Sequence, residues 1–199
     1  RFENLGTLTK TGAGTLDFGY NGGLLIDQRG VLNVQQGTLS INGVALLSGA
    51  QQLAAGGTLD IRGATTTLAA AGSVTGAGTL SLSGGTLNLA DGAGIASTLL
   101  HSGGTLLGSG ANTISGRYDW TAGIIDGDGT LTVSGPLQIT GSNTQFLNAR
   151  ALVHTNTSGS SRIFKTSGSV NLNNGAVLRN AGCARLLFDT GSGNFSVNS

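Results

Sequence analysis

The sequence has almost no cysteine, proline, methionine or tryptophan. Its 199 residues include one Cys, one Pro, no Met and one Trp, and only 5% of them are aromatic. The lone Cys183 excludes a disulfide framework and a thiolate metal cluster, and its small, apolar neighbours predict a buried, inert thiol. Because large rings are scarce, we expect a core built from Leu, Val, Ile and Ala.

Charge of one sign and long apolar runs are also missing. Ten basic against nine acidic residues leave a net charge of +1, which argues against nucleic acid and anionic membranes as partners. No run of about 18 apolar residues predicts a transmembrane helix, so direct membrane insertion is not expected, and no signal-peptide pattern is present. Since an initiator Met is absent too, we expect a segment of a longer polypeptide whose targeting signal and anchor lie outside it.

Glycine and a short repeated pattern dominate what is present. Gly accounts for 36 residues, a composition that disordered chains often share. The tripeptide Gly-Thr-Leu, however, occurs eight times, and each copy opens a run in which apolar and polar residues alternate, such as GTLSI at Gly37, GTLDI at Gly57 and GTLTV at Gly129. Alternation with a period of two predicts β-strands, and the leading glycine permits a turn or a close backbone approach.

The spacing of these runs predicts the fold. The copies at Gly14, Gly37, Gly57 and Gly78 are 23, 20 and 21 residues apart, too close for helical repeats or propeller blades. We predict an all-β, single-stranded parallel β-helix, a β-solenoid with about 20 residues per coil, about 9 or 10 coils and a length of roughly 45 Å. Inward positions include Leu39, Leu59, Leu80 and Leu131. One domain is expected over residues 1–199, with clear repeats in 1–150 and a less regular continuation in 151–199.

Two segments resemble a known group of bacterial surface proteins. Leu8 to Leu16, in the pattern L-x-K-x-G-x-G-T-L, and Tyr118 to Val133, YDWTAGIIDGDGTLTV, are similar to repeats of autotransporter passengers and filamentous-haemagglutinin-like adhesins. The resemblance implies a secreted or cell-surface rod that holds binding regions away from a bacterium, usually without catalysis and without cofactors or metals. Its implied partner is a glycan or a host or matrix surface.

Two other functions stay open at this point. A β-solenoid has open sheet edges at its ends unless they are covered, so a self-assembling extracellular filament or matrix subunit, a homopolymer through the solenoid ends, is the main alternative. A last strand around Phe195 to Val197 would form such an end. A polysaccharide-active enzyme is a remote alternative, because the same architecture carries glycosidases and lyases. Arg162 to Lys165 loosely matches the basic cluster of polygalacturonases, but the accompanying Asp and His motifs are missing.

One group of residues is a candidate ligand patch. Tyr118, Asp119, Trp120, Asp126 and Asp128 are the only dense cluster of carboxylates and rings. They could form a sugar or calcium site, with Trp120 stacking on a pyranose ring and the carboxylates supplying oxygen ligands. The alternative is a strand, a turn made by the two Asp-Gly pairs, and a second strand, with Trp120 capping the core.

Histidine and threonine give weaker indications. His101 and His154 are expected at surface or turn positions. Thr65, Thr66 and Thr67 are consecutive, which we interpret as unable to form one flat Thr-x-Thr face and therefore as an argument against ice binding.

Overall fold

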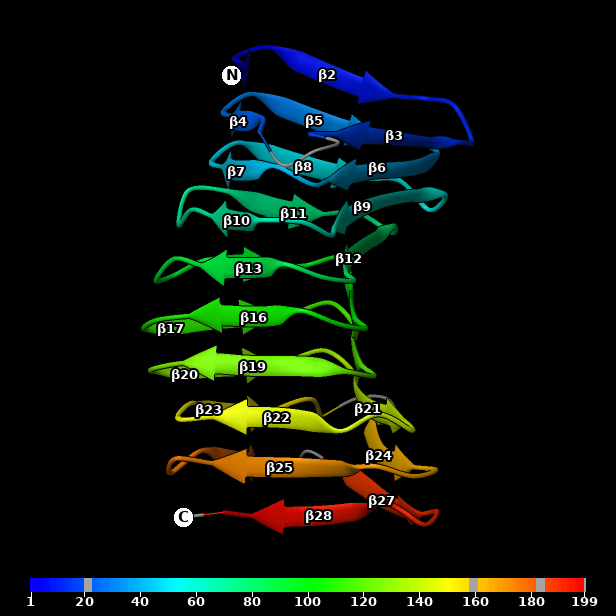
Figure 1. Cartoon of the computed structure of the whole chain (residues 1–199), viewed down its shortest axis with the longest axis vertical. Helices are drawn as coiled ribbons and strands as arrows, with labels where there is room; N and C mark the ends of the chain where they lie inside the picture. Colours follow the sequence, from blue (N-terminus) through cyan, green and yellow to red (C-terminus); the bar gives the residue numbers. More distant parts are fainter. Residues whose placement is uncertain (20–22, 158–160, 182–184, 199) are drawn as a thin grey trace.

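The chain winds into a rod whose two ends carry the two termini (Figure 1). The computed structural model describes residues 1–19, 23–157, 161–181 and 185–198, and every regular element in these ranges is a β-strand. Each coil contributes one short strand to each of three parallel sheets, named A, B and C here, with roughly 21 residues per coil. The prediction of an all-β parallel β-solenoid is confirmed. The prediction for Cys183 concerns a residue outside the described ranges.

Sheet A contains ten strands, which in spatial order are β1 (Phe2–Asn4), β4 (Leu25–Gln28), β7 (Val44–Leu47), β10 (Thr65–Leu68), β13 (Thr86–Leu89), β16 (Thr105–Gly108), β19 (Gly123–Gly127), β22 (Gln145–Asn148), β25 (Ser169–Asn173) and β28 (Asn194–Val197).

Sheet B contains nine strands, which in spatial order are β2 (Thr7–Lys10), β5 (Val31–Val34), β8 (Ala50–Leu53), β11 (Ser73–Thr75), β14 (Gly94–Ile95), β17 (Ala111–Ile114), β20 (Thr130–Val133), β23 (Ala151–His154) and β26 (Val177–Asn180).

Sheet C also contains nine, which from the N-terminal end are β3 (Thr15–Phe18), β6 (Gly37–Ile41), β9 (Gly57–Ile61), β12 (Thr79–Leu82), β15 (Thr98–His101), β18 (Tyr118–Trp120), β21 (Leu137–Gly141), β24 (Ser161–Lys165) and β27 (Leu186–Thr190). In all three sheets each strand pairs with the equivalent strand one coil before and one coil after.

In sheet C, four Gly-Thr-Leu copies stack on one another in register. Their threonines Thr15, Thr38, Thr58 and Thr79 form one column along the rod, which Thr98 of the Ser-Thr-Leu segment continues. Some of the leading glycines are required by close backbone approach: at Gly85, where φ is +57°, a Cβ atom would lie 1.7 Å from the carbonyl oxygen of Gly63. The sequence period is therefore the coil itself.

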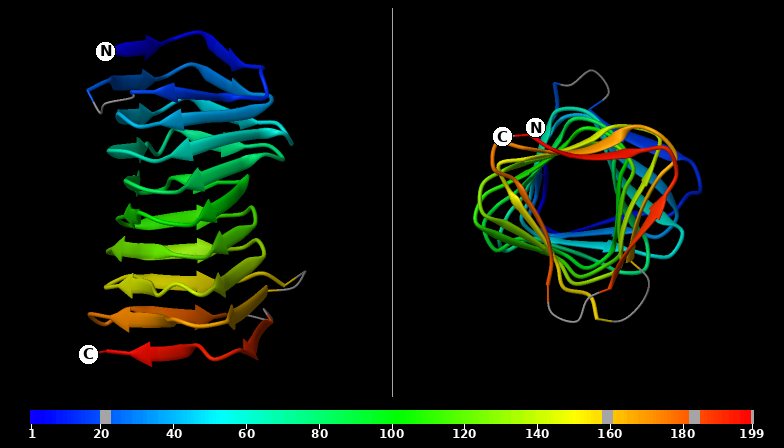
Figure 2. Two further views of the ribbon diagram at one scale, coloured as in Figure 1. Left: turned by 45° about the vertical axis from the view of Figure 1, so that its right-hand side comes forward. Right: turned by 90° about the horizontal axis from the view of Figure 1, so that it is seen from below.

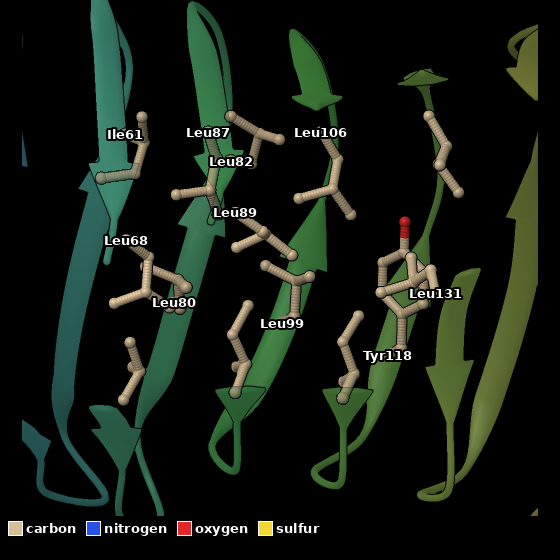
Figure 3. Close-up of a cluster of buried hydrophobic side chains, with 14 of the residues drawn as sticks. Ile61, Leu68, Leu80, Leu82, Leu87, Leu89, Leu99, Leu106, Tyr118 and Leu131 are labelled. Carbon is tan, nitrogen blue, oxygen red and sulfur yellow. The ribbon is translucent and has the colours of Figure 1, made fainter. Parts of the chain in front are cut away.

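Apolar side chains fill the centre of the rod. Leu39, Leu59, Leu80 and Leu131 are each at most 1% exposed, which confirms their predicted inward orientation. Figure 3 shows leucines from successive coils stacked along the rod, and the view along the axis shows the coils superposed around a common centre (Figure 2). Burial of these aliphatic columns is the main stabilising term of the fold.

The two ends of the rod are open sheet edges. At the N-terminal end, each of the strands β1, β2 and β3 is hydrogen-bonded to a neighbouring strand along one edge only. At the C-terminal end, the same holds for β26, β27 and β28. The prediction of a last strand around Phe195 to Val197 is confirmed by β28. Because the end coils are covered on one side, Phe188 is 57% exposed and Val197 is 72% exposed.

Candidate functional site

The two rings of the candidate patch lie inside the rod. Strand β18 alternates inward and outward, so Tyr118 and Trp120 are fully buried while Asp119 between them is partly exposed. Trp120 occupies an inward column between His101 and Ile139. The hypothesis that Trp120 stacks on a sugar is therefore wrong, because no face of its ring is open to solvent. The alternative, Trp120 capping the core, is right about the packing of Trp120 against the core, but the ring lies within the core between two coils and not at its cap.

The three carboxylates of the patch belong to different surfaces. Asp119, on sheet C, accepts the Nε–H of Arg117, which is shared between its Oδ1 and Oδ2 at 2.7 and 2.8 Å. Asp126 lies in β19 of sheet A, and its Oδ1 accepts from the backbone N–H of Gly127 at 2.7 Å. Asp128 follows in the turn before β20. The turn expected from the two Asp-Gly pairs is confirmed for Asp128-Gly129 only, because Asp126 and Gly127 belong to strand β19. The patch is not assembled as one site.

A metal site is not formed by the described residues. Across residues 1–19, 23–157, 161–181 and 185–198, no three His, Cys, Asp or Glu side chains are grouped as ligands of an ion.

A carboxylate pair that the sequence analysis did not single out lies near the N-terminal end. Glu3 and Asp27 occupy neighbouring positions on the outer face of sheet A. Arg1 contacts both, at 3.3 and 2.6 Å, and Arg29 contacts Asp27 at 2.8 Å. The hydrogen bond from Arg29, followed by that from Arg1, holds the pKa of Asp27 below its usual value against the opposing effect of burial. These carboxylates are engaged in ion pairs, which is a structural role.

Both histidines are fully buried, so the expectation of surface or turn positions is wrong. The physical reason is the parity of their strands. In β15 and β23 the second and fourth residues point inward, and His101 and His154 are the fourth residues. The Thr-Leu start that TLLH shares with TLSL of the preceding coil could have identified His101 as inward, whereas ALVH has no polar and apolar alternation that would place His154.

His101 packs against two aromatic rings. Its Nδ1 lies 3.0 Å from the hydroxyl oxygen of Tyr118, and its ring stacks on that of Trp120 with centroids 6.1 Å apart and an interplanar angle of 14°. Burial lowers the pKa of His101 to about 4, although the carbonyl groups of Gly104 and Gly103 act in the opposite direction. A Cβ atom at Gly123 would lie 2.5 Å from His101 Nε2, so the ring needs a glycine there.

Arg150 is a second buried basic group. Its side chain is fully buried and reaches back two coils, where Nη2 donates a hydrogen bond to Asn112 Oδ1. Burial lowers the pKa of Arg150, and the charges of Tyr118 and Asp128 partly offset this. Space for the guanidinium comes from Gly108, whose Cβ atom would lie 2.5 Å from Nη1. In the register of sheet A, Gly108 stands where the preceding coil has Leu89.

His154 and Lys165 continue this series toward the C-terminal end. His154 lies between Asn180 Oδ1, 2.7 Å from its Nδ1, and Ser161 Oγ, 2.9 Å from its Nε2. Lys165 is 5% exposed and donates from Nζ to the carbonyl of Asn143 at 2.5 Å and to Gln145 Oε1 at 2.6 Å. Burial lowers the pKa of Lys165. A cavity of about 230 Å³ adjoins Lys165, Ile163, Phe188 and Phe195 at the open end.

The threonines at 65–67 behave differently from the sequence interpretation. Thr66 is fully buried, and Thr65 and Thr67 lie together on the outer face of sheet A, because alternate residues of a strand share a face. The stated argument against a Thr-x-Thr row is therefore wrong. The Thr-x-Thr pair is not repeated in the adjacent coils, because the positions equivalent to Thr67 there are Leu46 and Asn88.

These features define a class of protein: a three-sheet parallel β-solenoid with an aliphatic core and a series of buried basic groups in its C-terminal half. Within the described residues no helix is long and apolar enough to cross a bilayer. Comparison with protein-family models, with curated protein sequences and with solved structures gave no match.

Proposed function

We propose that this chain is an extracellular, non-catalytic β-helical stalk or adhesin segment of a large bacterial surface protein. One observation carries the proposal: the inward columns run through consecutive coils along the rod, as in the sheet C column Leu39, Leu59, Leu80 and Leu99. Such stacking gives a stiff element whose length grows with coil number, which is what reach from a surface requires. The passenger-like repeats in the sequence support the same proposal.

The outer faces support a partner of neutral chemistry. The five-membered threonine column of sheet C presents hydroxyl and methyl groups in line along the rod. Hydroxyl-rich surfaces of low charge can exchange hydrogen bonds with sugars without needing an opposite charge. A glycan or a host or matrix surface is the partner that we propose for the stalk.

The proposal is tested on purified protein and on the cells that produce it. We expect a monomeric rod across a range of concentrations in sedimentation, labelling of intact cells by an antibody against the chain, and retention on a glycan or matrix array. Release of products from a polysaccharide panel, or labelling only after cells are permeabilised, would contradict it.

An end-to-end filament is the second candidate, favoured by the way the inward columns end. Phe18 and Phe188 are the first and last residues of the same column of sheet C, and Phe2 and Val197 end one column of sheet A. A second copy stacked head to tail would continue apolar columns with apolar residues, and such a non-closing contact produces fibres.

Electron microscopy separates the two candidates. Filaments with a subunit repeat of roughly 45 Å, set by the strand spacing, would favour the polymer, and deletion of residues 194–199 should then shorten or abolish them. Short single rods at every concentration would count against the filament and leave the stalk.

A further inference from the structure

The buried ionisable groups of this rod are distributed unevenly. Among the described residues, the buried basic groups facing the interior are His101, Arg150, His154 and Lys165, all in the second half of the chain. The buried carboxylates are Asp27 and Asp60, which lie on outward columns and contact Arg29 and Arg62. Arg150 interacts with the charge of Asp128, whereas His101 contacts the hydroxyl of Tyr118 and the carbonyl of Gly104 and no carboxylate.

His101 is the group most enclosed by rings and aliphatic side chains. Leu82 precedes it in its column and Trp120 follows. The titratable group that contacts it is Tyr118, which in turn interacts with the charge of Arg150. From sheets A and B, the inward residues of the same coil are the aliphatic Leu106 and Ile114 together with Gly108 and Asn112, against which the guanidinium of Arg150 lies. A proton on His101 would place a second cation in the region that already holds Arg150.

We propose that the coil containing His101 is an acid-triggered opening point of the rod: protonation of the buried imidazole separates β15 from β18 and exposes Trp120, while the coils before Thr79 stay closed. The N-terminal coils stay closed because their inward columns consist mainly of Leu, Ile and Val. The rod would then respond to acid at one place rather than along its whole length.

The direction of the effect follows from proton linkage. The pKa of His101 is about 4 when buried, against 6.5 when exposed, so the opened state binds more protons between these values. Opening is therefore favoured as the pH falls through this window, and the closed state is fully favoured above 6.5. The two values give an increase of the opening constant of about 100-fold between pH 7 and pH 4. Asp27, whose pKa is lowered below 3.8, loses its ion pairs below this window.

The single tryptophan provides the readout. Trp120 is the only Trp of the chain and is fully buried against His101, so its fluorescence reports exposure at the proposed opening point. We expect a reversible red shift with a midpoint between pH 4 and pH 6.5. In the same window, hydrogen exchange should accelerate in peptides covering 98–120, after correction for intrinsic rates, and change little in peptides covering 37–61.

The test variant replaces His101 and Tyr118 by leucine, so that leucine continues along both of their columns. His101→Leu combined with Tyr118→Leu places Leu where the preceding coil has Leu82 and Leu99, and removes the imidazole together with the hydroxyl that contacts it. We expect its fluorescence transition to move below pH 4. His154→Gln is the matched control, a buried imidazole removed elsewhere in the rod, and should retain the wild-type transition.

Three results would each overturn the proposal. The first is an unchanged transition in the double variant. The other two need no variant: equal loss of protection in 98–120 and 37–61 of the wild-type protein, and a Trp120 spectrum that stays blue down to pH 4.

Discussion

At the scale of single residues, the interior of the rod shows how a missing side chain makes room for a large one. Gly108 takes an inward position that Leu89 fills one coil earlier, and the guanidinium of Arg150 occupies the space. Since interiors are close-packed, this exchange fixes Arg150 in place. The bond to Asn112, 38 residues away in sequence, ties three successive coils together.

Gly108→Ala should therefore destabilise the protein. The new methyl group would lie 2.5 Å from Arg150 Nη1 and 2.7 Å from Asn112 Oδ1, so both buried groups must move. We expect a loss of about 1–3 kcal/mol in the free energy of unfolding, measured by chemical denaturation. Gly56→Ala is the control, because its Cβ atom would meet its nearest neighbour at 3.7 Å. Equal stability of the two variants would contradict the packing described at Gly108.

Residue placement was only partly predictable from the sequence. Leu39 and Leu80 could be assigned inward because a Gly-Thr-Leu run fixes the parity of its strand. The same parity rule applied to YDW would have placed Tyr118 and Trp120 inside, and it was the clustering of Asp119, Asp126 and Asp128 that suggested a surface patch instead. The burial of Arg150 could not be predicted, since its partner lies two coils away and no local pattern connects them.

At the scale of the element, the coil is the unit of structure. Each strand pairs only with its equivalents in the adjacent coils, so stability is expected to be a sum of coil and nearest-neighbour terms. The fold was predictable at this scale because the spacing of the Gly-Thr-Leu copies and the alternation of polar and apolar residues can both be seen within one or two coils of sequence. The lengths of the turns were not, and the register offset grows from 19 residues at Leu99 and Tyr118 to 26 at Leu152 and Leu178.

Removal of one whole coil should be tolerated. Deleting residues 58–78 joins Gly57 to Thr79, and the register of sheet C shows that Thr58 and Thr79 are equivalent positions. We expect a folded rod, shorter by about 4.8 Å, with a cooperative thermal transition. Deleting only residues 58–68 removes strands from sheets C and A but none from sheet B, and should abolish that transition. Similar behaviour of the two deletions would contradict the coil as the repeating unit.

At the scale of the whole molecule, the rod has two kinds of coil. Coils in the middle are covered on both sides, while the end coils β1 to β3 and β26 to β28 are covered on one side. Exposure of Val197 at 72%, against full burial of Leu106 in the middle, reflects this difference. Partial openings should therefore start at the ends at neutral pH.

Hydrogen exchange at pH 7 tests this gradient. We expect amide protection to be greatest in β12 to β20 and to fall toward both termini, because an end coil can leave after losing contacts on one side. Mass spectrometry of peptides along the chain measures it, with the urea-unfolded protein as the reference for full exchange. Uniform protection from end to end would indicate a single cooperative unit instead.

The direction of the hydrogen bonds in the parallel sheets also determines how the rod would respond to a stretching force. Their ladders join each coil to the next, so these hydrogen bonds lie along the rod, and the termini stand at its opposite ends (Figure 1). A force that pulls the termini apart acts on the hydrogen bonds of an end coil in sequence. These bonds therefore break one after another and not all at once. Each released coil of roughly 21 residues would add about 70 Å of extended chain, so the rod would lengthen stepwise and dissipate a sudden load.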